Sequence, residues 1–371
     1  MSAPFVLVAG GTGGHLFPAE ALAAELVAHR RQVRLLTDSR VEGFAADLPG
    51  IEVTHLKVAR IEKGLVRTAQ GLAALSAAAL QSRRLLRRHA PAAVIGFGGY
   101  PSLPTMLAAV SLGLPTLIHE QNAVLGRANR LLAPLVRGIA TGFPDTKRLR
   151  SADRARAVHI GNPVRAAVLA LGAVPYARPE PDQPIELVIL GGSQGAHILG
   201  DVVPAALAIL PKPLRERLRI SQQARPEDHA VAVEAYAKAG ITAQVESFFS
   251  DVPQRLARAH LAICRAGAST IAELTAIGRP AVLIPYPHAT DDHQTANARA
   301  IAAAGGARLI AQSELRVEGL AADLEKMFAD GSALSLMAQH AAAFGRRDAA
   351  HDLATLALAL EPGAALQECA A

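Results

Sequence analysis

Aromatic side chains are scarce in this chain of 371 residues: tryptophan is absent, and Phe, Trp and Tyr together make up 4% of the sequence. Proteins that hold single-stranded nucleic acid stack its bases on exposed aromatic rings. No recognised nucleic-acid-binding motif is present either. The formal net charge of +6 fits nucleic acid, anionic lipid or a phosphorylated substrate. A basic nucleic-acid-binding protein is therefore kept as a hypothesis, but the scarcity of aromatics weighs against it.

Cysteine and long apolar runs are also scarce. The two cysteines, Cys264 and Cys369, form neither a metal-binding spacing nor a disulfide framework, which favours a reducing compartment. The longest apolar stretch, residues 101–118, is interrupted by two prolines and a glycine, whereas a membrane-spanning helix needs roughly 18 continuous apolar residues. We expect the first strand from about Pro4, which leaves no room for a signal peptide before it.

The residues that are present indicate two similar α/β units. FVLVA (5–9) is a short apolar run followed by a glycine loop and a helical pattern, and IELVIL (185–190) begins the same plan again. Apolar runs that alternate with helical patterns predict parallel sheets covered by helices. The chain is also long for one core. The fold class predicted is α/β, with two doubly wound parallel-sheet domains whose ligands bind in the cleft between them.

Three glycine loops follow predicted strands, at residues 10–14, 96–99 and 191–195. Such a loop lets backbone N–H groups approach an anion at a helix N-terminus, although a tight turn without a ligand is the alternative. Leu16 stands where the third glycine of GxGxxG belongs, and GxxxxGK[ST] does not occur. A dehydrogenase or a P-loop enzyme is therefore disfavoured.

Six blocks of sequence, in order along nearly the whole chain, resemble the MurG family of bacterial glycosyltransferases. They are GGTGGHLFPA (10–19), HEQNAVLGRANRLLA (119–133), GNPVR (161–165), GGSQGA (191–196), CRAGASTIAEL (264–274) and HATDDHQTANA (288–298). The resemblance implies a GT-B fold, with two Rossmann-like domains facing across a cleft. It assigns the acceptor and membrane association to a domain at 1–162, with a helix at 345–362 packing back on it. It assigns UDP-GlcNAc to a domain at 163–344.

The activity that this resemblance implies is an inverting hexosyl transfer. N-acetylglucosamine moves from UDP-GlcNAc to the 4-OH of the MurNAc of undecaprenyl-pyrophosphoryl-MurNAc-pentapeptide (lipid I), which gives lipid II and UDP for peptidoglycan. It implies no metal and no cofactor, peripheral attachment to the cytoplasmic face of the inner membrane, an anionic membrane surface as partner and no nucleic acid. Other proteins of wall synthesis or division are left open as partners. A UDP-GlcNAc 2-epimerase is the alternative of the same architecture, and the HEQN and GGTGGH blocks argue against it.

The resemblance places the sugar donor on residues of the domain at 163–344. Ser193 and Arg165 would contact the diphosphate, Glu273 the ribose hydroxyls, Gln294 the sugar hydroxyls and the backbone of Phe249 the uracil. The segment that opens the helix before Glu273 supplies further contacts: Ala268, Ser269, Thr270, Ile271 and Ala272. We expect Ser269 or Thr270 to cap this helix, whose free N–H groups can hold phosphate. Ordinary capping without a ligand is the alternative reading.

On the acceptor side, the matching residues are Thr12, Gly13, Gly14, His15 and Asn122. His15 is the first candidate for the general base, because a histidine with its ordinary pKa of about 6.5 accepts a proton near neutral pH. The alternative is a histidine that bonds to the loop and orients the substrate. Glu120 is the rival base.

A basic stretch at residues 60–89 bears on the membrane. Apolar residues there alternate with Arg60, Lys63, Arg67, Arg83, Arg84, Arg87 and Arg88. Such a surface attracts anionic lipid by about 1 kcal/mol per charge. A helix that packs on the core and has a solvated basic end is an equal alternative.

Overall fold

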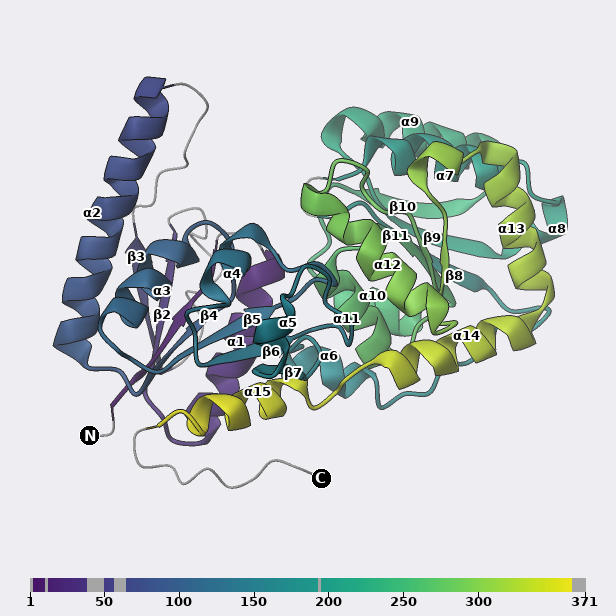
Figure 1. Ribbon diagram of the computed structural model, residues 1–371. Coiled ribbons are helices and arrows are strands. Elements are labelled where there is room, and N and C mark those ends of the chain that lie inside the picture. The colour runs from purple at the N-terminus through teal and green to yellow at the C-terminus, as the bar shows by residue number, and fades with distance from the viewer. Residues whose placement is uncertain (1–2, 11–12, 39–49, 57–64, 193–194, 362–371) are drawn as a thin grey trace. The chain divides into compact units, whose positions relative to one another are not determined.

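The computed structural model describes residues 3–10, 13–38, 50–56, 65–192 and 195–361. The chain divides into two compact units. The first is Met1–Arg165 together with Arg347–Ala371, and the second is Ala166–Arg346 (Figure 1).

A seven-stranded sheet forms the centre of the first unit, and every neighbouring pair of its strands is parallel. The order is β3-β2-β1-β4-β5-β6-β7. The strands are β1 (Phe5–Val8), β2 (Val33–Asp38), β3 (Ile51–Leu56), β4 (Ala93–Gly96), β5 (Thr116–Glu120), β6 (Gly138–Thr141) and β7 (Ala157–His159). The order reverses between β1 and β4, and in such sheets ligands bind outside the carboxyl ends of the strands at this point.

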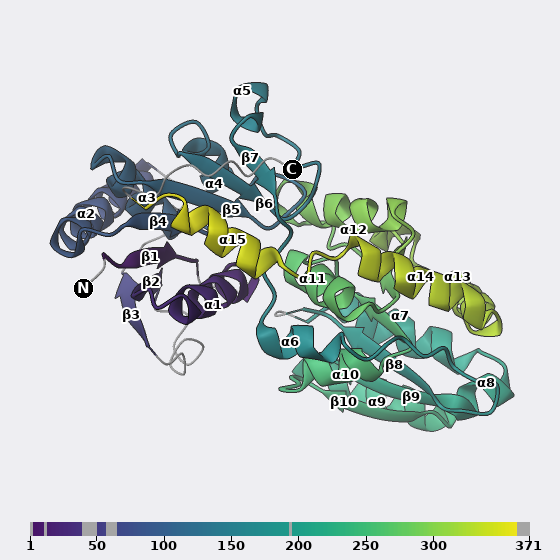
Figure 2. The same ribbon diagram turned by 90° about the horizontal axis from the view of Figure 1, so that it is seen from below.

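Helices cover both faces of this sheet (Figures 1 and 2). They are α1 (Gly13–Ala28), α2 (Leu65–His89), α3 (Ser102–Ser111), α4 (Arg127–Leu132), α5 (Ser151–Arg154) and α15 (Ala349–Leu358). Side chains of a strand alternate between its two faces. Phe5 and Leu7 of β1 therefore join a core with α1 and α15, whereas Val6 and Val8 join another with α2, α3 and α4.

The second unit repeats the plan with six parallel strands in the order β10-β9-β8-β11-β12-β13. They are β8 (Ile185–Leu190), β9 (Leu218–Gln223), β10 (Thr242–Glu246), β11 (Leu261–Cys264), β12 (Ala281–Leu283) and β13 (Ala307–Leu309). This is the same strand order as β3-β2-β1-β4-β5-β6. The prediction of two doubly wound parallel sheets is therefore confirmed.

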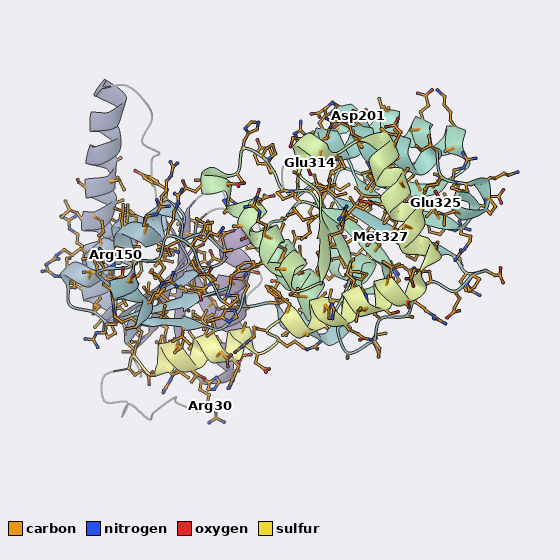
Figure 3. All side chains as sticks on the ribbon, turned by 45° about the vertical axis from the view of Figure 1, so that its right-hand side comes forward. Arg30, Arg150, Asp201, Glu314, Glu325 and Met327 are labelled. Carbon is orange, nitrogen blue, oxygen red and sulfur yellow. The ribbon has the colours of Figure 1, made fainter. Side chains whose placement is uncertain are left out.

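The helices of the second unit are α6 (Ala166–Leu171), α7 (His197–Ala208), α8 (Lys212–Arg217), α9 (Pro226–Ala239), α10 (Val252–Arg258), α11 (Ala268–Ile277), α12 (His293–Ala303), α13 (Val317–Ala329) and α14 (Gly331–Phe344), with short 3-10 turns at Thr290–Asp292 and Gln312–Glu314. Helix α13 is amphipathic in the usual way: Leu324 is buried and Met327 packs against the core, whereas Glu325 is exposed (Figure 3). Charged side chains that Figure 3 labels are exposed in both units, among them Arg30 and Asp201.

Candidate active site

The carboxylate of Glu120, at the end of β5, is buried and accepts N–H groups on both oxygens. Its Oε1 accepts from the backbone N of Asn122 at 3.0 Å and from the Asn122 side-chain Nδ2 at 3.2 Å. Its Oε2 accepts from the backbone N of Gly126 at 2.8 Å and from Asn129 Nδ2 at 2.9 Å. An ionised carboxylate has about four acceptor positions. Glu120 therefore ties the end of the strand to the following loop and to α4.

His15 lies in the first turn of α1 and is half-buried. Its Nδ1 lies 3.1 Å from Oε1 of Gln121, which is 106 residues away in sequence. The other edge of the ring faces the backbone of Gly99, where an added Cβ would be 3.2 Å from Cδ2 and 3.4 Å from Nε2. Gly99 has a φ of +75°, in the left-handed region that glycine tolerates. The loop after β4 therefore leaves Nε2 uncovered by any side chain at this position.

His119 and Gln121 continue the contacts of His15 into the core. The Gln121 Nε2 lies 3.1 Å from Nδ1 of His119 and donates to the His119 backbone O at 3.1 Å. The His119 Nε2 lies 3.0 Å from the backbone O of Gly161. Burial lowers the pKa of His119 to about 4, the Gly161 carbonyl opposes this and the nearby His15 adds to it. His119 is therefore neutral at neutral pH.

The first unit thus brings His15 together with the block at 119–122 through Gln121. Gly13 and Gly14 open α1 beside His15, and Asn122 is half-buried on Glu120. Thr12 lies outside the described residues.

Sequence reasoning missed Glu20, a buried acid on α1. Burial raises its pKa to about 7, and the positive charge of Arg165 partly opposes this rise. The Arg165 guanidinium lies 4.4 Å from the centre of the Phe17 ring, so Arg165 packs beside α1. The sequence signal that could have identified Glu20 is an acidic residue within the apolar pattern of this helix.

In the second unit, helix α11 begins at Ala268 with Gly267 at the N-cap, and no side chain caps it. The prediction that Ser269 or Thr270 caps this helix is therefore wrong. Gly267 adopts an extended conformation that suits an N-cap position. Within the described part of the chain, the buried Oγ of Ser269 has no hydrogen-bond partner. An uncapped helix N-terminus with a hydroxyl beside it is a suitable place for a phosphate group.

Gln294 has its amide oriented by two backbone donors. Its Oε1 accepts from Ala266 N at 3.2 Å and from Tyr286 N at 2.9 Å. The half-exposed side chain therefore keeps its NH₂ group as the donor toward a ligand hydroxyl. Asn297, one turn further along α12, donates to the O of Ala266 at 3.1 Å. These bonds hold the predicted sugar-binding segment against the loop that precedes α11.

Arg265 and Phe249 are both buried, and each contacts residues of the second unit. Arg265, which sequence reasoning did not single out, is buried and donates to the O of Ile284 at 3.0 Å and of Pro285 at 3.1 Å. The ring of Phe249 is 5% exposed and stacks under Arg255 at 4.1 Å, so the ring belongs to the core.

The other residues predicted to bind the donor belong to α11 and to the glycine loop at 191–195. Ile271 is buried, whereas Thr270, Ala272 and Glu273 are half-exposed on α11. Ser193 lies outside the described residues.

The described residues provide neither a metal-binding cluster nor a membrane-spanning helix. No group of three or more His, Cys, Asp or Glu side chains among them is placed to hold a metal ion. No helix among them combines the length and apolar character needed to cross a membrane.

Comparison with known proteins gives consistent matches along the chain. Residues 5–141 match the glycosyltransferase family 28 N-terminal domain, and residues 186–353 match the C-terminal domain of the same family. A relative from Rhodospirillum centenum, named UDP-N-acetylglucosamine–N-acetylmuramyl-(pentapeptide) pyrophosphoryl-undecaprenol N-acetylglucosamine transferase, is 53% identical over 96% of this chain and 94% of its own. A relative of the same name from Paramagnetospirillum magneticum is 52% identical over 96% of each chain.

The structure is also similar to a crystal structure of MurG from Acinetobacter baumannii. The TM-score is 0.77 and the sequence identity 31%, over 96% of this chain and 99% of that one.

Proposed function

Because the chain belongs to glycosyltransferase family 28, we propose that it catalyses the reaction for which its relatives are named. It is a hexosyltransferase that moves N-acetylglucosamine from UDP-GlcNAc to lipid I, and it thereby makes the lipid II used in peptidoglycan synthesis. The observation that carries this conclusion is the 53% identity over 96% of this chain and 94% of the relative. A match of that extent includes both units rather than a nucleotide-binding half alone.

We propose His15 as the general base. The proton of the acceptor 4-OH moves to Nε2 as the oxygen attacks the anomeric carbon. The bond from that carbon to the UDP oxygen breaks, and UDP leaves with the electron pair. Because the attack comes from the face opposite UDP, the configuration at the anomeric carbon is inverted. The rival Glu120 is less suitable, because its four acceptor positions are taken by N–H groups of its own unit. Gly13, Gly14, Asn122 and Thr12 would line the acceptor's side of this site.

The donor site proposed lies at the N-terminus of α11. The uncapped helix and the Ser269 Oγ, which has no hydrogen-bond partner among the described residues, support phosphate binding there. Ser193 and Arg165 remain the further phosphate contacts that the family resemblance assigns. The oriented NH₂ of Gln294 is suited to a sugar hydroxyl. Glu273, on the same helix, would accept two hydrogen bonds from the ribose diol. The backbone at Phe249 remains the proposed contact for uracil.

Peripheral attachment to the cytoplasmic face of the inner membrane is proposed through the last turns of α2. Leu80 is 58% exposed there. Arg84 and Arg87, which follow it at helical spacing on the same face, are exposed, as is Arg88. The opposite side of the helix packs through Leu86 and Ser82, which bonds to Thr105 of α3. An exposed leucine with arginines around it is suited to an anionic lipid surface.

The reaction itself is tested with UDP-GlcNAc and a soluble lipid I analogue, in buffer stripped of divalent metal. We expect UDP and the disaccharide product in equal amounts. Release of UDP without acceptor, together with free N-acetylmannosamine, would instead indicate the epimerase. Salt-sensitive binding to nucleic acid without turnover would instead favour a basic nucleic-acid-binding protein.

A further inference from the structure

We propose that Gln121 and His119 form a positioning relay that fixes the neutral tautomer of His15, so that Nδ1 carries the proton and Nε2 is the nitrogen that accepts one. This proposal rests on the function proposed above, since it explains how His15 would be prepared as a base. Neither Gln121 nor His119 needs to touch the substrate. Their effect is transmitted through two hydrogen bonds.

A backbone carbonyl at the buried end of the relay determines which atom donates in each of its hydrogen bonds. The O of Gly161, 3.0 Å from His119 Nε2, can only accept a hydrogen bond. The proton of His119 is therefore on Nε2. Because burial lowers the pKa of His119 to about 4, the ring is neutral and its Nδ1 carries a lone pair.

Gln121 transmits this direction, because its amide can be oriented in only one way. The Nε2 end faces two acceptors, the Nδ1 lone pair of His119 and the His119 backbone O, each at 3.1 Å. The reverse orientation would place the amide oxygen against both of them. An NH₂ group has one hydrogen for each acceptor. The Oε1 of Gln121 therefore faces outward, toward His15.

His15 completes the relay by donating. An amide oxygen only accepts, so the Nδ1 that lies 3.1 Å from Gln121 Oε1 must carry the proton. In the neutral ring the lone pair is then on Nε2. Within the described residues Nε2 has no hydrogen-bond partner, and the residue facing it is Gly99. The acceptor hydroxyl can thus deliver its proton to a nitrogen that already carries a lone pair, without a prior change of tautomer.

The direct test is nitrogen NMR of the full chain with ¹⁵N-labelled histidine and no substrate. We expect the Nδ1–H tautomer for His15 and the Nε2–H tautomer for His119, with signals assigned by H15Q and H119F. The Gln121→Met variant removes the amide but keeps the length of the side chain. It is expected to release His15 into a mixture of tautomers and to lower kcat by about tenfold or more, with a smaller change in KM. H119F leaves one of the two bonds that orient Gln121, and an intermediate effect is expected.

Gln339→Met is the matched control, because Gln339 is exposed on α14. It should change neither the His15 signal nor kcat. The wild-type spectrum alone can overturn the relay: an Nε2–H tautomer at His15 would do so even if Q121M failed to fold. A folded Q121M with unchanged tautomer and kcat would overturn it too. If instead the tautomer is as expected but H15A retains full kcat, the relay's catalytic purpose and the proposed base fail together.

Discussion

At the scale of single residues, the two candidate bases occupy different environments. Glu120 is 2% exposed and bonded on both oxygens, whereas His15 is half-buried and bonded at one ring nitrogen. A group that must exchange a proton with a substrate needs an unoccupied acceptor position within reach. These environments favour His15 over Glu120 for the proposed proton transfer, and the hydrogen bonds of Glu120 order the loop that follows it.

The first prediction concerns this division. H15A is expected to lower kcat by about 10²–10⁴-fold with little change in either KM, because general-base catalysis contributes in that range. Steady-state kinetics at saturating UDP-GlcNAc measure it, and H29A, an exposed histidine at the end of α1, is the control. Kinetic constants near wild type for H15A would exclude His15 as the base.

E120Q should chiefly lower the free energy of unfolding, by about 1–3 kcal/mol, because buried donors lose a charged partner.

The second prediction concerns the donor. The ribose is remote from the bond that is made, so Glu273→Ala should weaken UDP-GlcNAc binding rather than slow the chemical step. Hydrogen bonds to a charged group contribute about 1.5–3 kcal/mol each, so the donor KM should rise by at least about tenfold. Glu318→Ala, an exposed glutamate in the first turn of α13, serves as control. A donor KM equal to that of the wild type would remove Glu273 from the proposed site.

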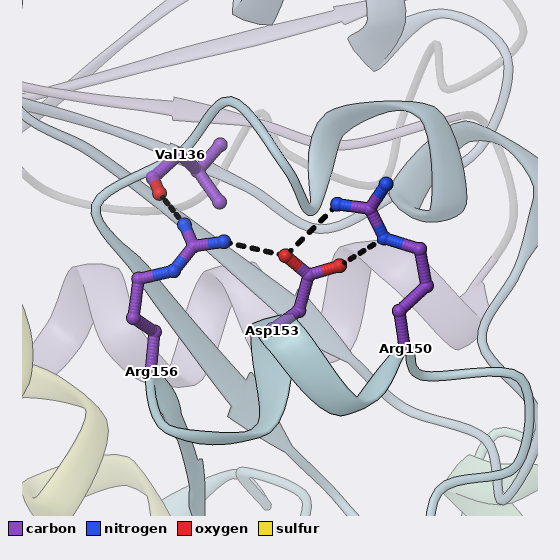
Figure 4. A network of polar contacts seen from close by, with 4 residues as sticks. All are labelled: Val136, Arg150, Asp153 and Arg156. Carbon is purple, nitrogen blue, oxygen red and sulfur yellow. Dashed lines mark hydrogen bonds and ion pairs between the residues drawn. The ribbon is translucent and has the colours of Figure 1, made fainter.

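At the scale of elements, a carboxylate holds α5 in place between two strands (Figure 4). Asp153 is 1% exposed and accepts from Arg150 at 2.7 and 3.1 Å and from Arg156 at 2.6 Å. Arg156 also donates to the backbone O of Val136, before β6. Mainly because of the hydrogen bonds from Arg150, the pKa of Asp153 is held below its usual range.

The third prediction follows from that lowered pKa. D153N should lower the free energy of unfolding by about 1–3 kcal/mol at pH 7. A carboxyl whose pKa is lowered in the folded state adds stability above the unfolded value of about 3.9 and loses it as pH falls through the folded value. The deficit of D153N should therefore be constant from pH 7 to pH 5 and shrink toward pH 3 in urea titrations.

D145N is the matched control, because Asp145 is 80% exposed and 3.9 Å from Arg154. Exposed pairs of this kind contribute little. Equal deficits for both variants, or a deficit that grows toward pH 3, would contradict the role given to Asp153.

The fourth prediction tests the end of α2. Charge reversal of Arg84, Arg87 and Arg88 to glutamate should weaken binding to vesicles that contain anionic lipid, by about 1 kcal/mol for each positive charge removed from the surface. Turnover of a soluble acceptor should stay near wild type. Sedimentation with vesicles measures the binding, and reversal of three exposed lysines of the second unit serves as control: Lys212, Lys238 and Lys326. Equal vesicle binding by both triple variants would remove α2 from the membrane contact.

At the scale of the whole molecule, the chain leaves the first unit at Arg165 and returns to it at Arg347. Its last described helix, α15, packs on α1 and places Leu353, Ala354 and Ala357 in the core of the first unit, each 0% exposed. An ion pair of 2.8 Å between Arg31 and Glu361 lies just beyond this helix. The first unit is therefore completed only after the second has been synthesised.

The fifth prediction uses this order. Leu353→Ala should destabilise the first unit by about 2–5 kcal/mol, the usual cost of truncating a buried leucine. All the proposed UDP contacts except Arg165 belong to the second unit, so UDP binding should persist in the same variant. Urea unfolding followed by probes in each unit separates the two effects, and Leu336→Ala, which is 52% exposed on α14, is the control. Loss of stability in the second unit alone would contradict this account.

Much of this organisation could be predicted from the sequence. Short apolar runs that end in glycine are typical of strands buried on both faces, so FVLVA and IELVIL predicted two parallel sheets, and the matched blocks predicted the family. Local patterns failed where tertiary packing decides. Ser269 or Thr270 was expected as the cap from its place at the start of the helix, yet Gly267 takes that position and the Ser269 hydroxyl is buried.

By itself, the sequence determined which residue types stand at the ends of the strands, because strand and helix periodicity follow from local order. Only the tertiary structure decided the partners of those residues. His15 and Gln121 are 106 positions apart, and His119 and Gly161 are 42 apart. Parallel strands from distant parts of the chain bring them to one edge of the sheet, and the direction of a hydrogen bond depends on which atom faces which. Tertiary packing determines which atoms face one another, and the order of residues along the chain does not.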